Sequence, residues 1–286
     1  MTKQRNDNYF SFPGFHGLSA TTLKLIAIVT MFIDHFAVVF EARLDAAFPF
    51  LVMDDGLNVL RAVGRLAFPI FAFLIAEGAK KTHNIWLYLL RLGVFAVISE
   101  VPFDLALMGT SFKTGVIEFE HQNVFFTLFL GLLSIALLQL LEKVHLAPLS
   151  FLFVLGFAYV AEELLKTDYG AMGVICIFLF YLFLQTNSKL KAVGIIGVCL
   201  LITVILSASV MVEELHYVSG RTGLMPEIFA TARYNSYEIW SVAAAPLLIL
   251  YNGKKGSLKI NKFVFYAFYP AHLLLLWGVF VLFFAA

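Results

Sequence analysis

Runs of about 20 apolar residues recur along this 286-residue chain and limit what it can fold into. Each run is long enough to cross the hydrocarbon core of a bilayer, which is roughly 30 Å thick. Apolar residues make up 61% of the chain and charged residues 14%, against roughly 45–50% and about 25% in typical soluble domains. The sequence therefore excludes an ordinary soluble domain and predicts a multi-pass membrane protein.

We predict nine membrane spans, at residues 22–40, 57–79, 85–108, 124–144, 149–165, 170–184, 190–212, 239–251 and 263–284. Backbone groups in hydrocarbon must bond internally, and the runs are continuously apolar rather than alternating, so the spans are helices and not barrel strands. The predicted fold is an all-α transmembrane bundle that forms a single domain over residues 1–286, with no internal repeat. The eighth span is short, and we expect it to be re-entrant or tilted.

Lysine and arginine residues in the short connections predict the orientation of the bundle. With the N-terminus in the cytoplasm, the inside segments hold twelve of the 20 basic residues and the outside segments hold five. The C-terminus then lies outside, residues 1–21 form a cytoplasmic segment, and residues 213–238 form an extracytoplasmic lid. We expect no cleaved signal peptide, because Asp34 and His35 interrupt the first run. The expected location is the cytoplasmic (inner) membrane of a bacterium.

Two classes of partner are not expected. The net charge of +1 provides no general attraction to nucleic acid. The two cysteines, Cys176 and Cys199, both fall inside apolar runs, so we interpret them as small hydrophobic side chains and expect no metal.

Ionisable residues inside the spans are the main functional signal, because each costs on the order of 3 kcal/mol or more in a bilayer. Spans four to seven hold almost none in their interiors. The function is therefore predicted on one side of the bundle, formed by spans one, two, three and nine. Those spans hold Asp34, His35, Arg61, Arg65, Glu77, Arg91, Glu100, Asp104 and His272.

Most of these groups are predicted to share one depth in the outer half of the membrane. His35 follows Lys24 by eleven residues, which places it about 16 Å deeper at about 1.5 Å per residue and nearly in line with it on the helix. The same layer receives residues from spans two and three and from the start of span four. These are Arg61, Arg65, Glu100, Asp104, His121 and Asn123.

The adjacent residues Asp34 and His35 diverge by about 100° on a helix, so they cannot form an acid–histidine dyad with each other. We expect His35 to take an orienting carboxylate from span three instead, with Glu100 and Asp104 as the candidates. His272, close to Pro270, is expected to have a packing or supporting role.

Asp34 is then available to neutralise Arg61 or Arg65, which are four residues apart and share a helix face. A histidine can take a proton from an attacking amine or hydroxyl, and an arginine can stabilise a developing oxyanion in a water-poor site. This chemistry favours acyl transfer, in which His35 acts as general base or as a transient acyl carrier. The alternative is that the charged pairs only tie helices together.

Four stretches of this sequence resemble the TraX family, strongly in the first half and mainly by hydropathy in the rest. They are LKLIAIVTMFIDH (23–35), GRLAFPIFAF (64–73), RL (91–92) followed by ISEVPFD (98–104), and QNVFFTL (122–128). The namesake of that family is associated with N-terminal acetylation of conjugative pilin. The resemblance therefore implies a membrane acetyltransferase that uses acetyl-CoA.

The chain is also distantly similar to membrane acyltransferases of the acyltransferase-3 type. Those enzymes carry an arginine, ten residues and a histidine in an early helix, and here Lys24 and His35 have that spacing with lysine in place of arginine. Their closely spaced arginines in a later helix are similar to Arg61 and Arg65, although three residues intervene here rather than two. The resemblance implies that Lys24, Arg61 and Arg65 contact the acyl group, its oxyanion or CoA.

The predicted function is transfer of an acetyl or other acyl group from cytoplasmic acyl-CoA to an amine or hydroxyl at the outer side. The CoA phosphates are expected near Lys80, Lys81, Lys189, Lys191 or the 254–262 loop. The acceptor, a protein N-terminus or a glycan, would enter from outside. A proton-coupled transporter is the alternative, since intramembrane acids, histidines and broken helices also suit a proton relay. A structural assembly factor is a third class.

Overall fold

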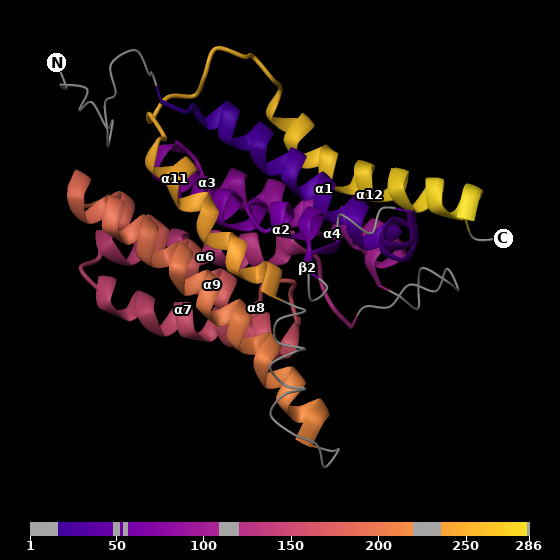
Figure 1. Cartoon of the computed structure of the whole chain (residues 1–286). Coiled ribbons are helices and arrows are strands. Elements are labelled where there is room, and N and C mark those ends of the chain that lie inside the picture. The colour runs from indigo at the N-terminus through magenta and orange to yellow at the C-terminus, as the bar shows by residue number, and fades with distance from the viewer. Residues whose placement is uncertain (1–16, 48–51, 54–56, 109–119, 220–235, 285–286) are drawn as a thin grey trace.

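The computed structural model of the chain describes residues 17–47, 52–53, 57–108, 120–219 and 236–284. Its helices pack lengthwise into one bundle (Figure 1). The long helices are α1 (Ala20–Ala47), α4 (Ile85–Leu107), α6 (Val124–Lys143), α9 (Ser188–Ser219) and α12 (Lys262–Phe284). A two-residue antiparallel pair, β1 (Val52–Met53) with β2 (Leu57–Asn58), precedes the second span and was not predicted.

Three of the predicted spans are built from more than one element. The second consists of α2 (Val59–Gly64) and α3 (Ala67–Lys81). The fifth consists of η3 (Ala147–Leu149), α7 (Ser150–Tyr159) and the π-helical turn η4 (Val160–Leu164). The eighth consists of the 3-10 segment η5 (Ser236–Ala243) and α11 (Ala244–Ile249), and α8 (Gly170–Leu184) forms the sixth.

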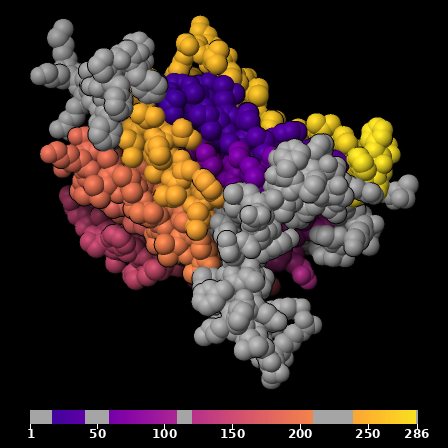
Figure 2. Space-filling model, in the orientation of Figure 1, coloured from indigo at the N-terminus to yellow at the C-terminus, as the bar shows by residue number. Residues whose placement is uncertain are grey.

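Within the described residues, seven helices are long and apolar enough to cross a membrane, and α8 and the η5–α11 segment are two shorter apolar helices. The nine predicted spans thus correspond one to one with nine helical segments, which confirms the multi-pass bundle. The eighth span is irregular because its first eight residues form a 3-10 helix rather than an α-helix. In Figure 2 this segment lies between α9 and α1 on the surface of the bundle.

The connections alternate between the two ends of the bundle as the span count requires. At one end Leu18 donates to the carbonyl of Leu250, and Lys80 donates to the carbonyl of Leu184. At the other end Gln122 pairs with Thr167. The first end carries the segments predicted to be cytoplasmic. The structure corrects part of the predicted lid at residues 213–238, because residues 213–219 continue α9 to Ser219 and residues 236–238 begin η5. Residues 220–235 of that lid lie outside the described residues.

The bundle has an apolar half and a half that carries the ionisable groups. In the apolar half α8 packs against α3, α6, α7 and α9, and most of its residues are buried. In the other half α1 packs against α2, α3 and α12, and α12 packs against α4. The spans that hold the intramembrane charges are therefore neighbours in space, as predicted.

Candidate functional site

The centre of the ionisable half is a pair of histidines from the first and last helices. His35 Nδ1 lies 2.7 Å from His272 Nε2, and the two rings are within 4° of coplanar with centroids 5.0 Å apart. Tyr269 contacts both rings edge-on, with centroids 5.9 Å from His35 and 5.7 Å from His272. The expectation that Glu100 or Asp104 orients His35 is therefore wrong, because His272 takes that position.

His35 and Asp34 face different helices, as their adjacency on α1 requires. Asp34 Oδ1 lies 2.8 Å from an Arg61 nitrogen, and Asp34 Oδ2 accepts a 2.6 Å hydrogen bond from Arg65. One buried carboxylate thus joins α1 to both arginines of the second span. The predicted pairing of Asp34 with these arginines is present, and we name the three residues the arginine–aspartate cluster.

Gly64 allows the arginine–aspartate cluster to form. A Cβ atom added to Gly64 would lie 2.2 Å from Cβ of Asp34, well inside contact distance. Only a glycine therefore lets the end of α2 approach α1 this closely. The helix is interrupted immediately afterwards, since α2 ends at Gly64 and α3 begins at Ala67.

Glu100 takes part in the start of the next helix rather than in the histidine pair. Its Oε2 accepts hydrogen bonds from the backbone and the side-chain amide of Asn123, and Asn123 also bonds the carbonyl of Ala96. Asn123 caps α6 as well, because its Oδ1 accepts from Phe125 N at 3.0 Å. Asp104 is fully buried on α4, and His121 is exposed just before α6.

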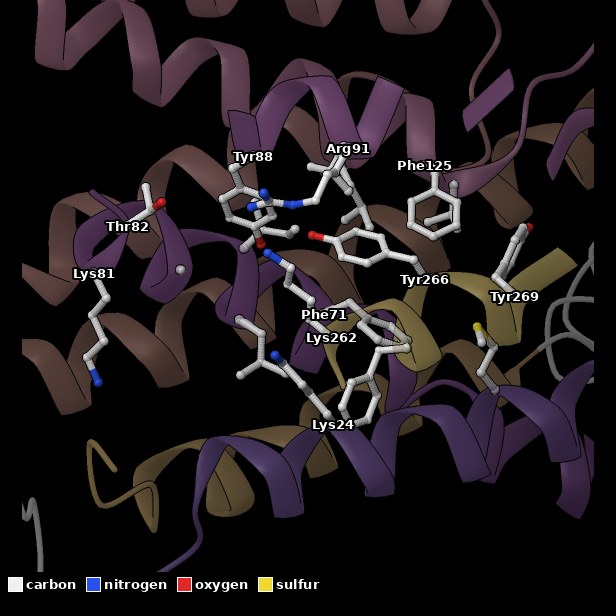
Figure 3. A pocket seen from close by; sticks show the side chains of 18 of the residues that line it. Lys24, Phe71, Lys81, Thr82, Tyr88, Arg91, Phe125, Lys262, Tyr266 and Tyr269 are labelled. Atoms are coloured by element: carbon white, nitrogen blue, oxygen red, sulfur yellow. The ribbon is translucent and has the colours of Figure 1, made fainter. Parts of the chain in front are cut away.

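A cavity of about 450 Å³ lies between α1, α3, α4, α6 and α12. Its wall carries five basic side chains and, among the described residues that line it, no acidic one. The basic residues are Lys24, Lys81, Arg91, Lys255 and Lys262. In Figure 3 Lys81 lies at one end and Tyr269 at the other, with Lys24, Lys262 and Arg91 between them.

Aromatic residues provide most of the remaining polar and flat surface of this cationic cavity. Lys24 Nζ lies 5.2 Å from the ring centre of Phe265, and the Arg91 guanidinium lies 5.7 Å from that of Tyr88. Such contacts hold a cation over a ring face and leave its charge available to an anion. An elongated ligand that is anionic at one end and apolar at the other would match this lining.

The loop after α11 is fixed at the basic end of the cavity. Lys81 donates to the carbonyl of Gly253 and to Tyr251 Oη, and it pairs with Glu77. Tyr251 in turn donates a 2.9 Å hydrogen bond to Glu77. This network holds the loop that delivers Lys255 to the cavity wall.

The cavity ends beside the histidine pair without including it. Tyr269 lines the cavity and contacts both imidazoles, so its ring is the wall between the two. Lys24 and His35 therefore lie on either side of this wall, in line along α1. The sequence predicted their alignment but not the tyrosine between them.

Sequence reasoning missed several residues of the cavity. Arg91 was named only as one of the ionisable residues in the spans, and Tyr88, Tyr266 and Tyr269 were not singled out. The signal was present in α12, where Lys262, Tyr266 and Tyr269 follow at intervals of four and three residues and so share one helix face. On α4, Tyr88 precedes Arg91 by three residues, so these two side chains also share one helix face.

The helical fold, the buried ionisable groups and the cavity together define the class of the protein. It is a multi-pass helical membrane protein with a buried ionisable site and a cationic cavity beside that site. The chain belongs to the TraX family, since the profile described as TraX protein matches residues 19–280. It is also similar to the probable fimbrial assembly protein FimC, serogroup H1, of Dichelobacter nodosus. The two are 29% identical over 266 residues, which cover 90% of this chain and 94% of that protein. No solved structure matches it.

Proposed function

We propose that this protein is a membrane acyltransferase that takes an acyl group, acetyl in the first instance, from acyl-CoA on the cytoplasmic side. The observation that carries the proposal is the cationic cavity, which ends at Tyr269 against the histidine pair. CoA is a polyphosphate with a long, uncharged pantetheine arm, so its two parts match the basic and the aromatic lining. Membership of the TraX family supports the same reaction class.

The basic end of the cavity would hold the phosphates. Beyond Lys81 at that end, Lys24, Arg91 and Lys262 extend into the cavity from α1, α4 and α12 (Figure 3). Lys255 lines the same cavity from the loop after α11. Phosphate oxygens gain charge-assisted hydrogen bonds from such groups, and the aromatic surroundings strengthen them by excluding water. The pantetheine arm would then follow the rings of Tyr266 and Phe125 toward Tyr269.

The reaction itself would occur beyond Tyr269, whose ring must turn aside to admit the thioester. An acceptor amine or hydroxyl attacks the thioester carbonyl carbon while His35 takes its proton. The new carbon–nitrogen or carbon–oxygen bond forms, the carbon–sulfur bond breaks, and the imidazolium returns the proton to the leaving thiolate. Transfer through an acyl-His35 intermediate is the other route, and it would give ping-pong kinetics.

The arginine–aspartate cluster would support this chemistry from the neighbouring position on the same turn of α1. Two arginines share one aspartate, so the cluster has a net positive charge close to the histidine pair. A positive field stabilises the oxyanion that develops during acyl transfer. The roles of Glu100 and Asn123 would be to fix the helix ends around the site.

The acceptor is proposed to be an extracytoplasmic amine or hydroxyl, on a protein N-terminus or a glycan. The relative from Dichelobacter nodosus is named as a probable fimbrial assembly protein, which makes surface-fibre subunits the first acceptors to test. Mass spectrometry of surface proteins and glycans from cells with and without the gene would identify the acceptor by a missing acyl mass.

Binding of the donor is tested with purified protein in lipid nanodiscs and labelled acetyl-CoA. Reversal of charge at the cavity, in Lys24→Glu and Lys262→Glu, should weaken binding at least tenfold. Lys143→Glu is the matched control, because Lys143 is exposed on the predicted cytoplasmic end of α6 and does not line the cavity. Equal losses in all three variants, or no binding by the unaltered protein, would contradict the proposed donor site.

Catalysis is tested by transfer of the label to a soluble amine and to extracted surface proteins. His35→Ala should abolish transfer while the protein keeps its thermal unfolding transition and its affinity for acetyl-CoA. If the protein binds no CoA but carries protons into liposomes, and His35→Ala stops that flux, the proposed enzyme is wrong and the protein is a proton-coupled transporter.

A further inference from the structure

His35 and His272 form a hydrogen bond whose geometry is nearly ideal. The 2.7 Å separation of His35 Nδ1 from His272 Nε2 and the 4° angle between the rings place the imidazoles edge to edge in one plane. The 5.0 Å separation of the ring centres agrees with this arrangement rather than with face-to-face stacking. A proton on one nitrogen therefore points along the lone pair of the other.

The hydrogen bond made by the other nitrogen of His272 determines which of the two histidines carries that proton. His272 Nδ1 is 2.7 Å from the carbonyl oxygen of Phe268. A carbonyl oxygen only accepts, so His272 Nδ1 must carry a hydrogen. A neutral imidazole has one N–H, and His272 Nε2 is consequently an acceptor. His35 Nδ1 must then be the donor of the bond between the two histidines.

We propose that His272 is a positioning residue that fixes the tautomer of His35, leaving His35 Nε2 unprotonated as the atom that takes the acceptor's proton. The inference rests on the proposed acyl transfer. In a serine protease triad an aspartate holds the histidine in this tautomer. Here a neutral imidazole, itself fixed by a backbone carbonyl, has that role.

A neutral partner suits the location of this pair. An additional buried carboxylate would have to be desolvated in the outer half of the membrane, whereas an imidazole has no such cost when neutral. When His35 Nε2 gains a proton, its Nδ1–H still faces the lone pair of His272. The positive charge is then spread over two hydrogen-bonded rings until the leaving thiolate recovers the proton.

Packing around the pair keeps both rings in place. The Phe268 ring stacks on His272 with centroids 4.7 Å apart, and Phe32 lies against it at 6.1 Å. His272 is 4% exposed, so water has little access to compete for Nε2. The orientation of His272 is therefore set by contacts within α12 and with α1, without any ligand.

The tautomer can be measured on the full-length protein in nanodiscs without any substrate. Nitrogen NMR of protein labelled at the histidine rings, with His35→Gln and His272→Gln for assignment, distinguishes protonated from unprotonated ring nitrogens. We expect His35 to be protonated at Nδ1 and bare at Nε2, with a scalar coupling across the bond to His272 Nε2. A bare His35 Nδ1, or no coupling, would overturn the assignment even if acyl transfer is confirmed.

The positioning role is tested by two substitutions that differ in hydrogen bonding. His272→Gln retains an acceptor for His35 and a donor for the Phe268 carbonyl, whereas His272→Phe retains a flat ring without either. We expect His272→Phe to lower kcat by about 10²-fold, the lower end of the range for a general base, with an unchanged KM for acetyl-CoA. His272→Gln should recover at least a tenth of the lost rate.

Leu276→Ala is the control for disturbed packing, since Leu276 is buried one turn further along α12. It should lower the unfolding temperature and leave kcat within a factor of three. Equal loss in the Gln and Phe variants, or wild-type kcat in His272→Phe, would refute the positioning role. If His272→Phe does not fold, the NMR measurement on the unaltered protein decides the question.

Discussion

Replacement of Asp34 by asparagine should destabilise the protein strongly, because one buried carboxylate serves two arginines. Asp34 contacts Arg61 at 2.8 Å and Arg65 at 2.6 Å, and their side chains are only 18% and 11% exposed. Removal of one partner from a buried ion pair costs roughly 3–5 kcal/mol. Since both arginines keep further contacts and some exposure, we expect about 3 kcal/mol, the lower end of that range, for Asp34→Asn.

The measurement is reversible unfolding in mixed micelles, followed by near-ultraviolet circular dichroism. Arg61→Gln and Arg65→Gln, singly and combined with Asp34→Asn, complete the double-mutant cycles. Each double variant should be more stable than Asp34→Asn alone, because one uncompensated charge has been removed. A loss below about 0.5 kcal/mol in Asp34→Asn, the size of an ordinary surface change, would refute the reasoning.

Three further predictions test other parts of the site. Gly64→Ala should cost about 1–3 kcal/mol in the same unfolding assay, because the new Cβ overlaps Asp34. Asn123→Ala should cost about 2–4 kcal/mol by the same measurement, because it removes the cap of α6 and the hydrogen bonds to Glu100. Tyr269→Trp should slow labelled acetyl transfer at least tenfold while acetyl-CoA affinity, measured by equilibrium binding, stays unchanged.

Most of the fold follows from hydropathy alone. The predicted span at 170–184 has the same bounds as α8, and the span at 85–108 differs from α4 by one residue. Bounds agree this well because polar residues end the apolar run and the helix at the same places, with Asn84 before α4 and Gln185 after α8. The break between α2 and α3 was not predicted, although Pro69 in the first turn of α3 is a local signal for it, because proline has no N–H to bond the carbonyl of Arg65.

The sequence predicted which residues form the site better than it predicted which of them contact one another. The sequence showed that Asp34 and His35 must face different helices, and it restricted the partners of Asp34 to the two arginines of the second span. It could not show which residue faces His35, because that depends on how the last helix packs against the first. His272 is 237 positions from His35, and no local period relates them.

The arginine–aspartate cluster and the histidine pair are mechanically linked through α1. Asp34 and His35 occupy successive positions on one helical turn, so a rotation that breaks the bonds of one also displaces the other. By holding Asp34, the two arginines fix the orientation of α1 about its own axis. In that orientation His35 Nδ1 faces His272 on a different side of the helix. Asp34 can thus affect the histidine pair through the rotation of α1, without contacting the ring nitrogens of either histidine.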